Sequence, residues 1–277
     1  MTISLDHDST RLAKTYDRVS DSQYEGGISL IERLRLTGPS RLLDVGCGTG
    51  RLALWAASNL PSGSKVVALD PLPERIAVAR DALNARSDLR NPVQFALGTA
   101  EDLHELADAS FDAAVLSSVF HWVHDKHKAL NEFARVLRPR GKLGITSGVK
   151  DVQLQNTAFQ VARQIFSVGP YAGRVDLSEN APGRPRHLGA SEFISLLEQT
   201  GFQLLGFHIV AREQVYASGN AFVDWIQSSS FGNYFRNVPE DLRDQARHDL
   251  ATALEEHRNG GGISLRQHRA LVVAERN

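Results

Sequence analysis

Leu42-Leu43-Asp44-Val45-Gly46-Cys47-Gly48-Thr49-Gly50 is the most informative segment of this chain. A short apolar strand, predicted over residues 41–45, runs into three glycines at alternate positions, and residues 52–60 then have the pattern of a helix. Glycine is needed where the backbone turns sharply and approaches a ligand, because a Cβ atom would obstruct that approach. An ordinary strand-to-helix turn does not require three such glycines with an acid two residues before the first. The segment therefore predicts a ligand-binding loop.

Strands alternate with helices along most of the chain. Strands are predicted at residues 41–45, 65–70, 92–97, 111–117, 142–146, 201–210 and 269–275. Helices are predicted at residues 9–20, 27–36, 52–60, 73–83, 126–138, 155–167, 190–199 and 220–229, and from Pro239 onward. This alternation favours a parallel sheet covered by helices on both faces, which is an α/β, doubly wound architecture.

The composition is that of an ordinary globular protein. Of the 277 residues, 42% are hydrophobic and 23% are charged, which argues against disorder or a coiled coil. Lys plus Arg number 31 and Asp plus Glu 32, so the net charge of −1 provides no overall basic field for nucleic acid or anionic lipid. Cys47, the single cysteine, cannot form an internal disulfide, and the sequence shows neither a signal peptide pattern nor an apolar run of membrane-spanning length. These features predict a soluble, cytoplasmic protein.

Two aspartates indicate which ligand the glycine loop binds. Asp70 lies 20 residues beyond Gly50 at the end of the next strand, where a carboxylate can accept from both hydroxyls of a ribose; a turn or capping aspartate is the alternative. A dinucleotide fingerprint reads G-x-G-x-x-G and holds a pyrophosphate, whereas this loop reads G-x-G-x-G and has Asp44 upstream, which would repel phosphate. An acid at this place suits a cationic amino group, and this points to the methionine end of S-adenosylmethionine.

The chain resembles the class I S-adenosylmethionine-dependent methyltransferases at five motifs, in the order expected of that family. The matching segments are residues 42–50, 66–71, 98–103, 110–112 with 120–122, and 135–143. The resemblance is close over about residues 10–147 and looser over the terminal strand pair. It implies a Rossmann-like, doubly wound sheet of seven strands, mostly parallel with an antiparallel last strand. It also implies that the chain binds S-adenosylmethionine at the carboxyl ends of the early strands and releases S-adenosylhomocysteine.

The same resemblance assigns donor-binding roles. The residues implied to contact the donor are Asp44, Gly46, Gly48, Asp70, Pro71, Thr99, Ala100, Glu101, Ser117, Tyr16 and Gln23. The first three would hold the methionyl part, Asp70 the ribose, and the loop 99–101 the adenine. Many relatives place an aspartate where Thr99 stands, so the contact to the adenine amino group would pass to Glu101 or Asp102. Tyr16, Asp17 and Gln23 are similar to an N-terminal segment that often closes over the donor, although Tyr16 is also a candidate for simple packing onto the core.

His121 is the candidate general base. It follows the fourth predicted strand, at the edge where open α/β sheets place their ligands. Methyl transfer from a sulfonium is an in-line displacement, and a base is needed chiefly when the acceptor is a weakly acidic hydroxyl or carbon acid. The alternative is that His121 and Trp122 only shape the pocket wall. A metal site at His121, His124 and His127 is rejected, because three-residue steps on a helix spread the side chains over roughly 240°.

Substrate recognition is expected in two added segments. The excursion 148–187 and the insert 211–268 both leave carboxyl ends of strands and together would form a helical lid on a core made of residues 1–147 and 188–277. Phe222, Trp225 and Tyr234 are candidates for the wall of an apolar substrate cavity, or else for the small core that packs the lid helices. A basic cluster that would meet an acidic substrate group, or else stay solvated, comprises Arg174, Arg184, Arg186 and His187.

The sequence thus predicts an S-adenosylmethionine-dependent methyltransferase for a small-molecule acceptor, with an oxygen or carboxylate favoured and secondary metabolism as a setting. A tRNA or protein methyltransferase is the alternative, and it would need an open cleft and a basic stripe. Two more remote alternatives are an NAD-dependent oxidoreductase, which the upstream acid and the glycine spacing disfavour, and a non-catalytic S-adenosylmethionine-binding module. No metal, nucleic acid or membrane partner is expected.

Overall fold

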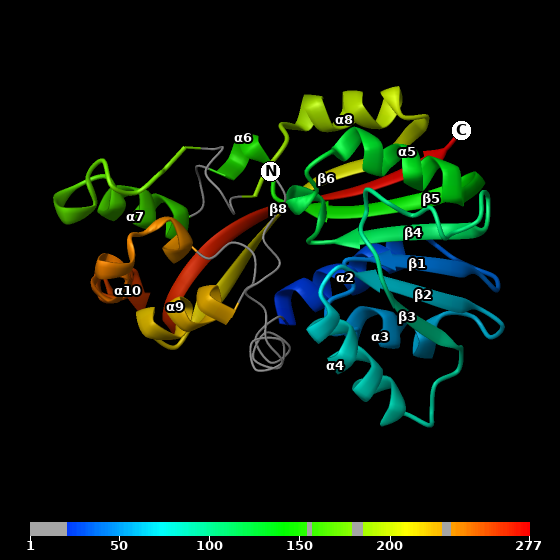
Figure 1. The fold of residues 1–277 in the computed structure, drawn as a ribbon, viewed down its shortest axis with the longest axis horizontal. Helices are drawn as coiled ribbons and strands as arrows, with labels where there is room; N and C mark the ends of the chain where they lie inside the picture. The colour runs from blue at the N-terminus through cyan, green and yellow to red at the C-terminus, as the bar shows by residue number, and fades with distance from the viewer. Residues whose placement is uncertain (1–20, 154–156, 179–184, 229–233) are drawn as a thin grey trace.

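The computed structural model describes residues 21–153, 157–178, 185–228 and 234–277 (Figure 1). The helix predicted at residues 9–20 lies outside this part of the chain, and so do Tyr16, Asp17 and Arg184. Figure 1 shows two bodies: a sheet with helices on both faces, and a smaller helical body at the far end of two long strands.

The larger body is organised by one sheet. Its strands are β1 (Arg41–Val45), β2 (Lys65–Asp70), β3 (Val93–Leu97), β4 (Phe111–Ser117), β5 (Leu137–Ser147), β6 (Phe202–Tyr216), β7 (Arg258–Asn259) and β8 (Gly262–Arg276). Seven of them follow the order β3-β2-β1-β4-β5-β8-β6, and the two-residue strand β7 pairs with β8 off this path. Neighbours from β3 to β5 are parallel, whereas β8 is antiparallel to both β5 and β6. The predicted sheet of seven strands, mostly parallel with an antiparallel last strand, is confirmed.

Helices cover both faces of this sheet. The α-helices are α2 (Asp21–Arg33), α3 (Arg51–Asn59), α4 (Pro73–Asn84), α5 (Lys126–Val136), α6 (Lys150–Gln153), α7 (Thr157–Phe166), α8 (Ala190–Gln199), α9 (Gly219–Ser228) and α10 (Arg243–Glu255). Short 3-10 turns are η1 (Phe120–Trp122), η2 (Gly169–Tyr171), η3 (Tyr234–Asn237) and η4 (Glu240–Leu242). Apolar residues of α2, α3 and α4 pack on one face, and those of α5 and α8 pack on the other.

Strand side chains alternate between these two cores. Leu42 and Val115 point to the core under α2, α3 and α4, whereas Leu43 and Leu116 point to the core under α5 and α8. Strands buried on both faces have no polar side to expose, which explains their nearly continuous apolar sequences. Because the strands are parallel, the loops after β1, β2, β3, β4 and β5 all emerge at one edge.

The smaller body, the helical subdomain, has a hydrophobic core of its own. It consists of α7, η2, α9, η3, η4 and α10 packed on the distal halves of β6 and β8. Phe166 and Tyr171 from the excursion 148–187 share this core with Phe222 and Leu250 from the insert 211–268. The two added segments therefore fold into one unit.

Four elements differ most from the sequence prediction. Helix α2 runs from Asp21 to Arg33 through Gly26-Gly27 without the predicted break. Gly27 does not end the helix but allows close packing, because a Cβ atom there would lie 2.6 Å from a methyl carbon of Leu52. Strand β5 begins at Leu137, which pairs with Phe111. Strands β6 and β8 extend to Tyr216 and Gly262, so the insert 211–268 begins and ends as strand. No helix in the described part of the chain is long and apolar enough to cross a membrane.

Candidate active site

The glycine loop after β1 has a backbone that favours glycine at three positions. Gly46, Gly48 and Gly50 have φ angles of 77°, 57° and 83°, all in the left-handed region. The amides of Gly46 and Cys47 both donate to the carbonyl of Leu69, at 2.7 and 2.9 Å, which ties the loop to the end of β2. The turn is therefore rigid and lies at the carboxyl ends of the two strands.

Asp70, at the end of β2, fixes the same loop with its side chain. Its carboxylate accepts from the amide of Gly48 at 2.9 Å and from the amide of Leu72 at 3.0 Å. The carboxylate thus lies at the carboxyl end of β2, beside the glycine loop. Pro71, which follows, is half-buried at the entry to α4.

Asp44 lies behind the loop and is 1% exposed. Its Oδ2 atom has no hydrogen-bond partner among the described residues. Burial, and next the charge of Asp70, raise the pKa of Asp44 to about 7. A buried carboxylate oxygen without a donor is costly, and a cationic ligand group would both pair with it and restore its ionisation.

The first two glycines of the loop make room for different neighbours. A Cβ atom at Gly46 would lie 2.2 Å from Cγ2 of Val119, so this glycine admits a side chain of the protein. A Cβ atom at Gly48 would meet nothing closer than Nη1 of Arg75, at 3.7 Å. The space over Gly48 is therefore open, as a site for a ligand that touches the backbone would be.

The loop after β3 is tied to α5. Ala100 is buried and Thr99 is exposed. Oε1 of Glu101 accepts from the amides of His124 and Asp125, at 2.9 and 2.7 Å, ahead of α5. Glu101 therefore has a structural role in addition to its predicted one.

Asp102, the other acid predicted near the adenine, pairs with His104. Its Oδ1 lies 2.6 Å from Nδ1 of His104, and this hydrogen bond lowers the pKa of Asp102. Both acids predicted for the adenine side thus have partners within the protein.

Ser117 and Gln23 come together at the end of β4. The Ser117 hydroxyl lies 3.5 Å from the carbonyl oxygen of Gln23 on α2 and 3.5 Å from the Thr146 hydroxyl on β5. Ser118 next to it has a positive φ of 61°, and its amide donates to Oγ1 and to the carbonyl of Thr146, at 2.9 and 3.0 Å. A non-glycine residue held in this conformation often marks a functional site.

His121 is on η1, half-buried, directly after β4. Its Nδ1 lies 3.3 Å from the hydroxyl of Ser147 at the end of β5. Its ring centroid is 5.0 Å from that of Trp122 and 5.2 Å from that of His187. Burial lowers the pKa of His121 well below its usual value, with further contributions from His187, Arg269 and Lys126. The histidine is therefore neutral at neutral pH.

Sequence reasoning missed three residues at this edge. Arg75 on α4 is 7% exposed and faces the glycine loop. Its place in the first turn of the helix that follows Asp70 could have identified it from the sequence. Lys126 is 8% exposed, and burial lowers its pKa to about 8. Arg269 donates to the hydroxyl of Ser118 at 2.9 Å. No local signal marks Arg269, because only the antiparallel pairing of β8 brings it to β4.

The aromatic residues of the insert lie in the helical subdomain. Phe222 is 1% exposed and packs against Tyr216 and Trp225, with ring centroids 5.1 and 5.8 Å apart. This environment fits the alternative of a packing core for Phe222 and for the half-buried Trp225. The side chain of Tyr234 lies outside the described residues.

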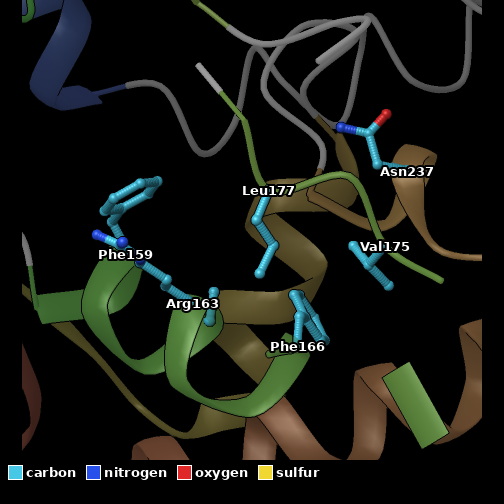
Figure 2. Close-up of a pocket in the computed structure, with 7 residues that line it drawn as sticks. Phe159, Arg163, Phe166, Val175, Leu177 and Asn237 are labelled. Atoms are coloured by element: carbon cyan, nitrogen blue, oxygen red, sulfur yellow. The ribbon is translucent and has the colours of Figure 1, made fainter. Parts of the chain in front are cut away.

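A shallow, open hollow is found in the helical subdomain (Figure 2). Phe159, Arg163 and Phe166 of α7 line one side of it, and Val175, Leu177 and Asn237 line the other. None of its lining residues comes from the strand-end loops. Within the described part of the chain, no three His, Cys, Asp or Glu side chains are grouped as they would be around a metal ion.

Sequence comparisons relate the chain to methyltransferases. Residues 43–145 match the model of a methyltransferase domain. An O-methyltransferase of Aspergillus nomiae is 32% identical over 179 residues, which cover 64% of this chain and 70% of that protein. Methyltransferase GfsG of Streptomyces halstedii is 30% identical over 214 residues, covering 76% of this chain and 66% of that protein. A methyltransferase of Mycobacterium tuberculosis is 42% identical over 114 residues, and this match spans only 42% of that protein's length.

Solved structures share the fold at low sequence identity. The YcgJ protein from Bacillus subtilis has a TM-score of 0.60 and 21% identity, covering 91% of this chain and 98% of that one. The cyclase SpnF has a TM-score of 0.57 and 22% identity, covering 91% of this chain and 80% of that one. Because a cyclase shares the architecture, the fold alone does not determine the reaction.

Proposed function

Because the chain belongs to the class I S-adenosylmethionine-dependent methyltransferases, we propose that it transfers the methyl group of S-adenosylmethionine to an oxygen or carboxylate of a small molecule. S-adenosylmethionine is the cofactor that this family uses, and S-adenosylhomocysteine is its product. The match to the mycobacterial relatives spans less than half of their length, so the activity and the acceptor are proposals for this chain.

The glycine loop supports this choice of donor. The ammonium group of S-adenosylmethionine suits Oδ2 of Asp44, which is buried and lacks a hydrogen-bond partner among the described residues. The open space at Gly48 suits the methionyl part, and the carboxylate of Asp70, held beside the loop by the amides of Gly48 and Leu72, suits the ribose. A pyrophosphate would instead face the charge of Asp44, which disfavours the NAD-dependent alternative.

When bound, S-adenosylmethionine supplies an electrophilic methyl group on a sulfonium. The contribution of this chain is to hold donor and acceptor in line and to exclude water, which together supply much of the rate acceleration of such a displacement. Asp44 would hold the methionyl part of the donor and Asp70 its ribose, while the β4 and β5 ends, with Ser117 and His121, provide the wall on the acceptor side. His121, neutral by burial, is available as a hydrogen-bonding group there.

Two observations favour a small acceptor over tRNA or protein. The relatives include O-methyltransferases named resE from Aspergillus sclerotiorum, 32% identical over 177 residues, and rstn1 from Aspergillus nomiae. The helical subdomain and its connecting segments also emerge from the acceptor edge of the sheet, where they can enclose a small molecule. A cytoplasmic location, which the single cysteine Cys47 suits, is part of the same proposal.

Calorimetric titration with S-adenosylmethionine, S-adenosylhomocysteine and NAD tests the donor site. We expect micromolar binding of the two sulfur ligands, loss of at least 100-fold in affinity for Asp70→Ala, and unchanged affinity for Arg266→Gln, an exposed residue paired with Glu213. Binding of NAD alone would refute the proposal.

A methyl-labelled donor then distinguishes the acceptor classes. Transfer to acids or phenols supports the proposal, and transfer to tRNA favours the alternative. Donor binding without transfer to any acceptor indicates a non-catalytic module.

A further inference from the structure

A hydrogen bond joins Ser147, the last residue of β5, to His121 in the 3-10 turn that follows β4. Oγ of Ser147 lies 3.3 Å from Nδ1 of His121. Ser147 is 3% exposed, and in the part of the chain that the structure describes this is the one hydrogen bond of its hydroxyl. A distance between two heavy atoms does not say which of them carries the hydrogen, so the direction of this bond follows from the surroundings of Ser147.

The place of Ser147 in β5 explains why its hydroxyl has a single partner. Side chains alternate along a strand, so Leu143, Ile145 and Ser147 point to the same face. Leu143 and Ile145 are fully buried in the core under α5 and α8, and Ser147 ends this row. It is held there by pairing with Ala270 of β8, which belongs to the same core. The hydroxyl is therefore a polar group at the margin of an apolar layer, with the His121 ring as its partner.

Burial decides the direction of this hydrogen bond. A buried hydroxyl is costly when its hydrogen has no acceptor. If Nδ1 of His121 carried the hydrogen and donated to Oγ, the hydroxyl hydrogen of Ser147 would be left without a partner. If the hydroxyl donates, its hydrogen and the lone pair on Nδ1 satisfy each other. The second arrangement is therefore favoured, and Nδ1 is the acceptor.

The neutral His121 ring carries one hydrogen on its two nitrogens. Burial lowers the pKa of His121 well below its usual value, so the ring is neutral at neutral pH. In a neutral imidazole, one nitrogen accepts and the other carries the hydrogen. Because Nδ1 accepts from Ser147, the nitrogen that carries the hydrogen is Nε2.

We propose that Ser147 fixes the tautomer of His121 with the hydrogen on Nε2, and that His121 holds the acceptor by donating this hydrogen to one of its oxygens. The proposal rests on the proposed function, in which His121 lines the acceptor side, and specifies what this residue does there. A nitrogen that already carries the hydrogen has no free lone pair with which to remove a proton, so His121 is not the general base. His121 is a hydrogen-bond donor to the acceptor, and Ser147 is a positioning residue.

The tautomer can be measured by NMR from the nitrogen resonances of the ring. The full chain is isotope-labelled at its histidines, and the His121 signals are assigned from their loss in His121→Gln. We expect the hydrogen on Nε2 and an Nδ1 resonance displaced by its hydrogen bond. This displacement should be lost in Ser147→Ala and kept in Ser147→Thr, which retains a hydroxyl. Ser110→Ala removes a serine hydroxyl bonded to Ala107 ahead of β4, and it should match the wild type.

A second measurement separates a hydrogen-bond donor from a base at His121. Glutamine can donate a hydrogen bond but cannot take a proton at neutral pH, whereas alanine can do neither. For transfer to the acids and phenols of the methyl-labelled assay, we expect His121→Gln to keep kcat/KM within about tenfold of the wild type and His121→Ala to fall at least about tenfold further. A general base contributes about 10²–10⁴-fold, and its loss would lower kcat/KM equally in both variants.

Three outcomes would each refute the proposal: a hydrogen on Nδ1 in the wild type, an Nδ1 resonance that does not move in Ser147→Ala, or equal losses of kcat/KM in the two His121 variants. If Ser147→Ala does not fold, Ser147→Cys takes its place, since a thiol is a weak donor and should reduce the displacement. The spectra are recorded with and without S-adenosylhomocysteine, whose binding is measured separately by calorimetry. The tautomer is measurable whether or not this ligand binds, so failure of the donor site and failure of the proposal are distinguishable.

Discussion

The binding role proposed for Asp44 is accompanied by a cost to the stability of the fold. A carboxyl group with a pKa near 7 in the folded protein and near 4 in the unfolded chain stabilises the fold when protonated, and this stability is lost as the pH rises from about 4 through 7. At pH 8 the ionised group costs on the order of 4 kcal/mol. Asp44→Asn removes this charge, so its free energy of unfolding should exceed that of the wild type by about 1–3 kcal/mol at pH 8 and by much less at pH 5. Urea denaturation at both pH values measures this.

The same substitution should weaken donor binding. Truncating one partner of a buried charge pair costs about 2–5 kcal/mol, so the affinity of Asp44→Asn for S-adenosylhomocysteine should fall at least 30-fold at pH 8. A variant that is less stable than the wild type at pH 8 and binds the donor equally well would contradict both roles of this residue.

Gly46 and Gly48 should respond differently to alanine. Gly46→Ala combines a left-handed φ with a contact of 2.2 Å to Val119, so it should cost about 2–4 kcal/mol, and Val119→Ala should recover part of this loss. Gly48→Ala has only the backbone strain, about 1 kcal/mol, yet should lower donor affinity at least tenfold because its methyl group enters the open space. Thermal unfolding and calorimetry separate the two effects. Equal stabilities for the two variants would contradict the assignment.

Residues of the glycine loop could be predicted from sequence, but the place of Arg269 at the end of β4 could not. The glycine spacing and Asp44 follow from the local demands of one turn, which a short segment contains. Arg269 reaches Ser118 across 151 positions of sequence, and no local pattern encodes that contact. Glu101, predicted from its place in a motif, also binds amides of a segment that only the fold brings near.

At the scale of elements, α2 contains two adjacent glycines with opposite consequences. A Cβ atom at Gly26 meets nothing within 4 Å, so Gly26→Ala should stabilise the protein by about 0.5–1 kcal/mol through helix propensity. A Cβ atom at Gly27 meets the buried Leu52 at 2.6 Å, so Gly27→Ala should destabilise it by about 1 kcal/mol despite the same gain in propensity. Chemical denaturation of both variants measures the sign of each change in the free energy of unfolding. Stabilisation by Gly27→Ala would contradict the close packing of α2 on α3.

The parallel part of the sheet was predicted more accurately than β6 and β8. Strands buried on both faces have an uninterrupted apolar sequence that ends at polar turns, so β1, β2 and β4 match their predicted bounds. The distal halves of β6 and β8 leave the sheet and mix exposed and buried side chains, as at Val215 and Tyr216, so their sequence resembles a polar insert. Their strand structure comes from pairing with each other.

At the scale of the whole molecule, the helical subdomain should lose its structure independently of the sheet. Leu250 is fully buried in the core of the helical subdomain, and Leu250→Ala should destabilise that body by about 2–5 kcal/mol. Hydrogen exchange should accelerate in α7, α9 and α10 while β1 and β4 stay protected, and S-adenosylhomocysteine affinity should stay within twofold. Leu43→Ala, in a core of the sheet, is the control and should accelerate exchange in β1 and β4. Uniform acceleration in Leu250→Ala would show that the two bodies unfold together.

Because β6 and β8 pair with each other along their whole length, the segment between them can be exchanged for another one. Tyr216 pairs directly with Ile263, so the chain leaves β6 and enters β8 at one pair of facing residues. Whatever lies between these two residues can change in length or sequence without shifting the register of any strand beneath it. We expect a graft of another segment at this residue pair to change the acceptor preference, while the glycine loop after β1, separated from β6 by β4, β5 and β8, is inherited intact.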